Sequence, residues 1–147
     1  MNEEFEDTSN LDKLRELQQN LESTERELLK RDALLAAIVT SAGEAIIARD
    51  FTGTVIVWNP AAEQLYGWQA EEMIGQKIYK IIPKGKIEEH ERFISAVRNG
   101  ESVGPIQTVR CTKAGEEVPI TLTVSPIIAR NGEILGVSAI EHEVVNE

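Results

Sequence analysis

The first third of the chain most constrains the fold, because a long segment of it contains no residue that would end a helix. From Leu11 to about Ala42 there is no proline or glycine, and charged side chains are dense. Leucines recur there at a strict seven-residue step, at Leu14, Leu21, Leu28 and Leu35, which form the first row of apolar residues. This spacing predicts a long amphipathic helix, and a sustained seven-residue apolar repeat is typical of a parallel two-stranded coiled coil.

The predicted seam identifies the residues through which two chains would pair. They are Leu14, Leu17, Leu21, Leu28, Leu35 and Ile38. Thr24 and Arg31 fall in the second row of the same seam, so its middle is polar and the coil is weakened there. A single amphipathic helix that lies on its own domain is the alternative, and the residues leave it open. We assign residues 1–40 to a coiled-coil helix and residues 41–147 to a folded domain.

The second part of the chain has the sequence pattern of a small domain that contains both helices and strands. "EAIIARD" and "TVIVW" are short β-branched runs around the turn sequence "DFTG", and they predict a hairpin. Short helical segments follow, each closed by glycine or proline, and a longer helix runs from about Gly85 to Arg98. "IQTVRCT", "VPITLTVSPI" and "ILGVSAIEHE" then predict three more strands. This order predicts an α+β fold, a five-stranded antiparallel sheet with short helices packed on one face.

Composition narrows the possible partners. The chain has 147 residues, of which 41% are hydrophobic, and a formal net charge of −10. That charge and the lack of a basic stripe argue against binding nucleic acid or an anionic membrane surface. Cys111 is the only cysteine, no apolar run is long enough to span a bilayer, and the acidic start is unlike a secretory signal. We therefore expect a cytoplasmic protein or a cytoplasmic piece of one.

Catalytic motifs are missing from the sequence. It contains no cluster of histidine and cysteine with zinc spacing, no glycine-rich loop after a strand, and no Gly-x-Ser-x-Gly elbow. Its paired carboxylates are typical of solvated faces and turns. We therefore expect that the protein is not an enzyme.

Several motifs, in their order and spacing, carry a resemblance to a known family. "VIVWNPAAEQLYGW", "EEMIGQKIYKIIP", "KAGEEVPITLTVSPI" and "GEILGVSAIEHE" together resemble a PAS domain, the small sensory module of many signalling proteins. The resemblance implies the PAS fold, with a cavity between the sheet and the helices. It also implies a module that forms homodimers through its N-terminal helix and relays conformational signals to a downstream domain or protein.

The candidate ligand residue is His90, which lies in the middle of an apolar helix face. "EEHERFI" resembles the segment of oxygen-sensing haem-PAS kinases in which a histidine binds the iron, which implies haem b with His90 as axial ligand. The pocket would be lined by Ile81, Ile87, Phe93, Ile94, Val97, Val109, Leu122 and Val124. Strand alternation, however, places Val109 and Cys111 inward and Arg110 outward, which leaves the distal half of the haem pattern missing. The preferred interpretation is therefore a packed core histidine with a hydrogen-bond partner.

Other cofactors follow from the same resemblance. Light-sensing flavin members need a reactive cysteine where this chain has Ile78, so covalent flavin photochemistry is excluded. A reversibly bound flavin, a small apolar metabolite or an empty cavity stay open. No metal is expected apart from a haem iron at His90.

Overall fold

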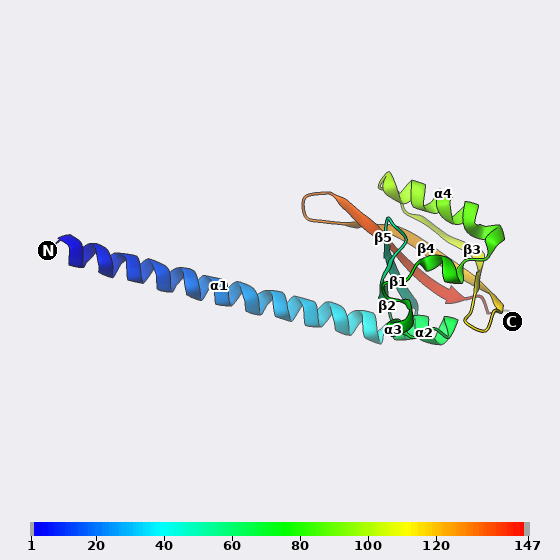
Figure 1. The fold of residues 1–147 in the computed structure, drawn as a ribbon, viewed down its shortest axis with the longest axis horizontal. Helices are drawn as coiled ribbons and strands as arrows, with labels where there is room; N and C mark the ends of the chain where they lie inside the picture. The colour runs from blue at the N-terminus through cyan, green and yellow to red at the C-terminus, as the bar shows by residue number, and fades with distance from the viewer. Residues whose placement is uncertain (1, 146–147) are drawn as a thin grey trace. The chain divides into compact units, whose positions relative to one another are not determined.

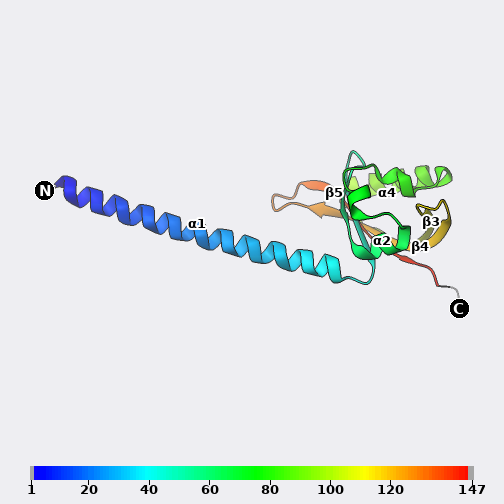
Figure 2. The same ribbon diagram turned by 60° about the horizontal axis from the view of Figure 1, so that its bottom comes forward.

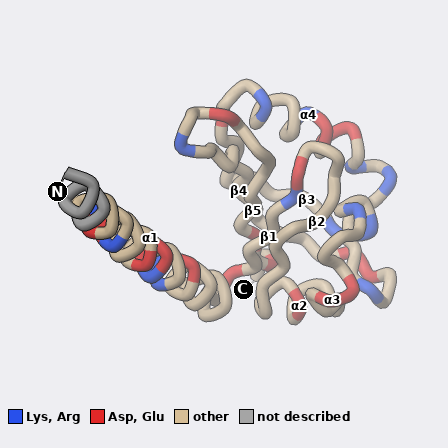
Figure 3. The backbone as a smooth tube through the Cα atoms, turned by 60° about the vertical axis from the view of Figure 1, so that its left-hand side comes forward, with Lys and Arg blue, Asp and Glu red and all other residues tan. Residues whose placement is uncertain are grey.

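The structure is a computed structural model that describes residues 2–145, with side chains described from residue 9 onward. The chain forms two units, Met1–Ile38 and Val39–Glu147, a division two residues before the predicted boundary. The first unit is one long helix, α1, which spans Asn2–Ser41 and so continues into the start of the second unit (Figure 1). Lys and Arg alternate with Asp and Glu along it (Figure 3). Within residues 2–145, no helix is long and apolar enough to cross a membrane.

The second unit contains the predicted five-stranded antiparallel sheet. Its strands are β1 (Ala45–Asp50), β2 (Val55–Trp58), β3 (Val103–Cys111), β4 (Glu117–Ile128) and β5 (Ile134–Glu143). They lie in the order β2-β1-β5-β4-β3, and every neighbouring pair is antiparallel. Figures 1 and 2 give two views of the domain that contains this sheet. The first and last strands are therefore neighbours near the middle of the sheet, which confirms the predicted fold class.

Short helices connect β2 to β3. They are α2 (Pro60–Tyr66), α3 (Ala70–Met73), the single 3₁₀ turns η1 (Ile78–Ile81) and η2 (Lys84–Lys86), and α4 (Ile87–Arg98). Asn59 starts α2, since its Oδ1 accepts the Ala62 N–H at 3.0 Å, and Pro60 fits the first helical position. Gly67 ends α2 in the left-handed region, at a φ of 79°.

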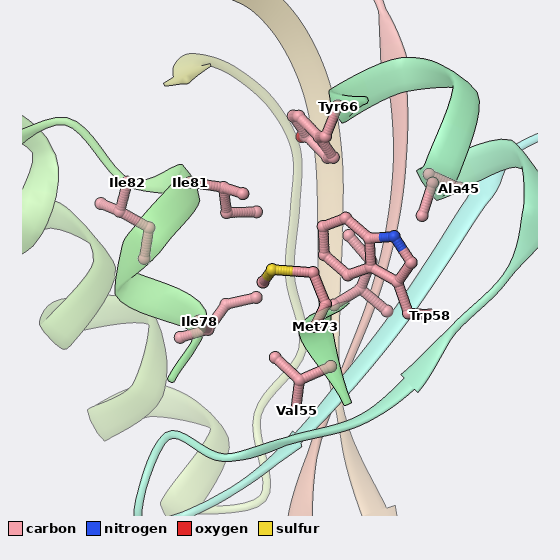
Figure 4. Packing of buried hydrophobic residues seen from close by; sticks show 10 residues of the cluster. Ala45, Val55, Trp58, Tyr66, Met73, Ile78, Ile81 and Ile82 are labelled. Atoms are coloured by element: carbon pink, nitrogen blue, oxygen red, sulfur yellow. The ribbon is translucent and has the colours of Figure 1, made fainter. Parts of the chain in front are cut away.

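The core of this unit consists of two groups of buried apolar side chains. The first packs the start of the sheet against α2, α3 and η1, and Figure 4 shows Trp58, Met73 and Ile78 together in it. The second packs α4 against β4 and β5, with Val97 and Ile120 fully buried at its centre. Helices and sheet therefore bury a common interface, and the space that side chains leave in that interface is the place to look for a ligand.

Candidate functional site

An internal cavity lies between the sheet and the segment that runs from η1 to α4. The centre of a water-sized molecule could move over about 30 Å³ of it, which is room for about two water molecules. The apolar wall residues are Ile47, Ile78, Ile81, Ile82, Leu122, Val124, Val137 and Ala139. The polar wall residues are Arg49, His90, Arg110 and Glu141, which come from β1, α4, β3 and β5. Three strands and one helix thus place four ionisable side chains around one small space.

The structure separates the nine residues predicted for the pocket. His90, Ile81, Leu122 and Val124 lie on the cavity wall. Buried in the adjoining core, away from the wall, are Phe93, Ile94 and Val97. Ile87 is half-buried and packs against the other core group, and Val109 is half-buried on β3. The predicted helix face therefore supplies core packing, with only its histidine at the cavity.

The predicted phase of β3 is wrong. Thr108 and Arg110 are buried, whereas Val109 and Cys111 are half-buried on the opposite face. The register explains this, because Arg110 pairs with Val118 and Thr108 pairs with Ile120, and directly paired residues share a face of the sheet. The prediction used strand alternation alone and placed Val109 and Cys111 inward. Arg110 instead reaches the same cavity as His90.

His90 is a hydrogen-bond acceptor for Arg49. The guanidinium Nη1 of Arg49 lies 2.7 Å from Nε2 of His90. Because arginine can only donate, Nε2 accepts and the ring carries its proton on Nδ1. Burial, as the largest cause, and the charges of Arg49 and Arg110 together lower the pKa of His90 to about 3. His90 is therefore neutral at pH 7 and has a fixed tautomer.

Glu141 and Tyr66 form a second buried pair at the cavity. The Tyr66 hydroxyl donates to Oε1 of Glu141 at 2.5 Å, and Glu141 is 4% exposed. Burial raises the pKa of the Glu141 carboxyl, and the hydrogen bond from Tyr66 and the charge of Arg110 oppose that rise. Burial and the adjacent Glu141 also raise the pKa of Tyr66 well above its usual range.

The sequence-based reasoning missed Arg49, Glu141 and Tyr66. The available indication was a charged residue inside an otherwise apolar strand, in "AIIARD" and in "AIEHE". Such a residue is buried only when a polar partner meets it. The partners of these two residues come from α4 and α2, which are distant in the sequence.

The residues at this site do not fit a haem. An axial histidine must offer a free ring nitrogen to the iron, but Nε2 of His90 is held by the cationic Arg49 at 2.7 Å. The cavity of about 30 Å³ is also far below the roughly 300 Å³ or more of a site for a large organic ligand. Across residues 9–145, no group of three or more His, Cys, Asp or Glu side chains is placed to hold a metal ion. Arg110 points inward and so supplies the distal polar side chain that the sequence prediction found missing. Nε2 of His90 is nevertheless still occupied by its hydrogen bond from Arg49.

The resemblance to light-sensing flavin proteins aligned Ile78 with their reactive cysteine, and Ile78 lies on the cavity wall. The single cysteine of the chain, Cys111, lies on β3 next to Arg110 and so faces the other side of the sheet.

Comparisons with known proteins agree with this architecture. A stretch of 71 residues, 48% of the chain, is 32% identical to the sensor protein FixL of Bradyrhizobium diazoefficiens, and it spans only 14% of that protein's length. The PAS domain of a protein from Colwellia psychrerythraea superposes with a TM-score of 0.69 at 27% identity, over 80% of this chain and 97% of that one. An RNA-binding Light-Oxygen-Voltage receptor superposes with a TM-score of 0.68 at 22% identity, over 76% of this chain and 32% of that one, which shows the fold alone.

The family model described as the PAS fold matches residues 33–144. That match covers the whole five-stranded sheet, all the helices between β2 and β3, and the last turns of α1. The chain therefore belongs to the PAS family.

Proposed function

We propose that this chain is a non-enzymatic PAS signalling module that forms a parallel homodimer through α1 and relays conformational changes of the PAS domain to a partner domain or protein. The observation that carries the proposal is the row of exposed apolar residues along α1. The seam residues Leu14, Leu17, Leu21, Leu28, Leu35 and Ile38 are all 52–64% exposed in the single chain. A second copy of the same helix has the seven-residue repeat needed to cover them.

The apolar burial available along this seam is similar in size to the cost of association. Completing the burial of the four leucines of the first row, in each of two chains, contributes roughly 7–14 kcal/mol. Association costs about 4–15 kcal/mol in lost translational and rotational freedom. The polar Thr24 and Arg31 lie in the middle of the second row and contribute no apolar burial. The dimer therefore depends on the whole leucine row, and a charge within that row is sufficient to prevent pairing.

Asn59 supplies a structural link through which the domain and the end of α1 could influence each other. Its Nδ2 donates to the carbonyl oxygens of Val39, in the last turn of α1, and of Glu44, both at 3.0 Å. Its Oδ1 accepts the N–H of Ile46 in β1 at 2.9 Å and that of Ala62 in α2. One buried side chain thus joins the helix end, the first strand and α2. This supports a relay in which a shift of β1 or α2 moves the last turn of α1.

The sequence match to a sensor protein supports a sensory role at the level of the family. The matched stretch is a small part of that protein, so the output partner of this chain is itself part of the proposal.

The test is the solution mass of the protein measured by light scattering and sedimentation. We expect a dimer for the wild type and a monomer for the double variant Leu21→Asp/Leu28→Asp, in which two charges enter the seam. The matched control is Gln19→Asp/Ala33→Asp, which adds the same charges to the outer face of the helix and should stay dimeric. A wild-type monomer at micromolar concentration, or equal masses for both variants, contradicts the proposal.

A further inference from the structure

The cavity contains more buried positive charge than negative charge. Arg49 and Arg110 are each 4% exposed, and both line the cavity. Among the side chains of residues 9–145, no carboxylate oxygen lies within 4 Å of either guanidinium. A buried charge is unfavourable unless an opposite charge or several hydrogen bonds compensate it. The two arginines therefore need a negatively charged partner that the described side chains do not supply.

The buried groups of this chain cannot balance both arginines. Among the described residues, Glu141 is the only acidic one on the cavity wall, and its Oε1 already accepts a hydrogen bond from the hydroxyl of Tyr66. His90 is neutral, because its Nε2 accepts from Arg49. Even with Glu141 ionised, two cations face one anion. At least one positive charge is therefore left in a nearly closed space.

The two guanidinium groups are held in place by acceptors that leave donors unused. Arg49 donates from Nε to the carbonyl oxygen of Asp50 at 2.9 Å, from Nη1 to His90, and from Nη2 to the carbonyl oxygen of Phe51 at 3.5 Å. For Arg110 the bond is from Nη1 to the carbonyl oxygen of Val109 at 2.9 Å. A guanidinium has five N–H donors in a planar fork. Both side chains therefore keep donors for a further acceptor, with their direction fixed by the bonds already made.

We infer that this cavity binds a small carboxylate anion, whose two oxygens accept hydrogen bonds from Arg49 and Arg110 and whose short apolar tail lies against Ile81 and Leu122. The room for about two water molecules suits an anion of the size of formate or acetate. A planar carboxylate matches the donor fork of arginine, and the aliphatic wall accepts a carbon atom that would gain nothing from water. The bound anion would supply the missing negative charge.

This inference goes beyond the proposed signalling module, since it names a chemical class for the input. Binding of the anion needs only the folded PAS domain, so its failure and the failure of the dimer are separate results. The use of that binding as a signal does rest on the proposed function. Light scattering of the same samples reports dimerisation independently.

The experiment titrates the full-length protein with sodium acetate and sodium formate, at constant sodium concentration maintained with sodium chloride. Thermal unfolding and the side-chain N–H signals of the arginines are followed by calorimetry and NMR. We expect saturable shifts of the Arg49 and Arg110 signals, and an unfolding midpoint that rises with the logarithm of the carboxylate concentration. Chloride alone should give neither effect.

Variants assign the effect to the cavity. Arg49→Met and Arg110→Met each remove one cation at similar volume, and each should weaken acetate binding by about tenfold or more. Arg92→Met, on the exposed side of α4, should bind as the wild type does. The Arg110 variant keeps the Arg49–His90 bond, so it tests the site even if loss of Arg49 unfolds the domain.

Three results would overturn the inference. The first is an absence of saturable shifts with either carboxylate. The second is equal loss of binding in the Arg92 control, which would indicate general adsorption of anions. The third is stabilisation by sodium nitrate without stabilisation by acetate, which would identify an inorganic oxyanion in place of a carboxylate.

Discussion

The buried His90 should make the protein progressively less stable as the pH falls below 6.5. The pKa of His90 is lowered from 6.5 to about 3 in the folded state, with burial as the largest cause and the two arginines as the next. Below pH 6.5 the unfolded chain therefore binds a proton at this position that the folded chain does not. The contribution of the neutral histidine to stability is complete above pH 6.5 and is lost progressively towards pH 3.

The size of the effect follows from the shift. A pKa difference of one unit corresponds to a little over about 1 kcal/mol, so the loss of unfolding free energy is about 1 kcal/mol at about pH 5.5 and about 3 kcal/mol at about pH 4.5. Completed below pH 3, it would approach about 5 kcal/mol. The free energy of unfolding of a small domain is roughly 5–15 kcal/mol, so this loss is a large part of it.

Other groups titrate in a different range or with the opposite sign. Hydrogen bonds from Thr52 and Lys113 lower the pKa values of Asp50 and Glu72, so these carboxyls weaken the fold only below their ordinary pKa values. The pKa of Glu141 is raised, so its protonation favours the folded state as the pH falls. A variant that changes His90 alone is therefore needed to isolate its contribution.

The matched variant is His90→Gln, whose amide oxygen can accept the hydrogen bond from Arg49 but does not titrate. Urea unfolding of both proteins is measured at one fixed protein concentration between pH 7.5 and about 4.5. We expect the wild type to lose about 1.4 kcal/mol per pH unit relative to the variant below pH 6.5. Parallel stability curves over this range would show that His90 does not have the lowered pKa, and the reasoning from its burial and its bond to Arg49 would be refuted.

Three further predictions use simpler readouts. Arg31→Leu replaces a cation in the predicted seam and should stabilise the α1 dimer by about 1–4 kcal/mol. The unfolding temperature should then rise with protein concentration. The control Arg26→Leu, on the outer face of the helix, should not stabilise the dimer. Asn59→Ala should cost about 2–4 kcal/mol in urea unfolding, because a helix cap is lost and several buried backbone groups lose their partner; a change below about 0.5 kcal/mol would contradict this. Added haemin should give no sharp Soret band that disappears in His90→Ala, because Nε2 is already engaged by Arg49.

The sequence predicted the parts of the fold that follow from local patterns. The segment "VPITLTVSPI" predicted a strand, which β4 confirms, and its alternating Ile120, Leu122 and Val124 are all buried. The pair Asn59-Pro60 is typical of a helix start, and α2 begins there. These features depend on neighbouring residues, so a single sequence is sufficient to read them.

The features that were missed depend on pairing between distant segments. Whether Arg110 or Val109 points inward is decided by the register of β3 against β4, and hydrophobicity alone selects the wrong residue. The burial of Arg49 depends on His90, which is contributed by a helix 41 positions along the chain. The four polar residues at the cavity are therefore brought together by tertiary contacts, and no periodicity within β1, β3 or α4 predicts them.

The position of β1 beside β5 has a consequence for how such a domain can be carried within a longer polypeptide. Ala45, the first residue of β1, pairs with Glu141, close to the end of β5, because the two strands run antiparallel. The chain therefore enters β1 and leaves β5 at the same end of these two neighbouring strands. A domain with this topology can be inserted between two existing segments without forcing them apart. Any segment that precedes β1 and any segment that follows β5 start from adjacent strands, so a small sliding of one strand against the other would be felt by both at once.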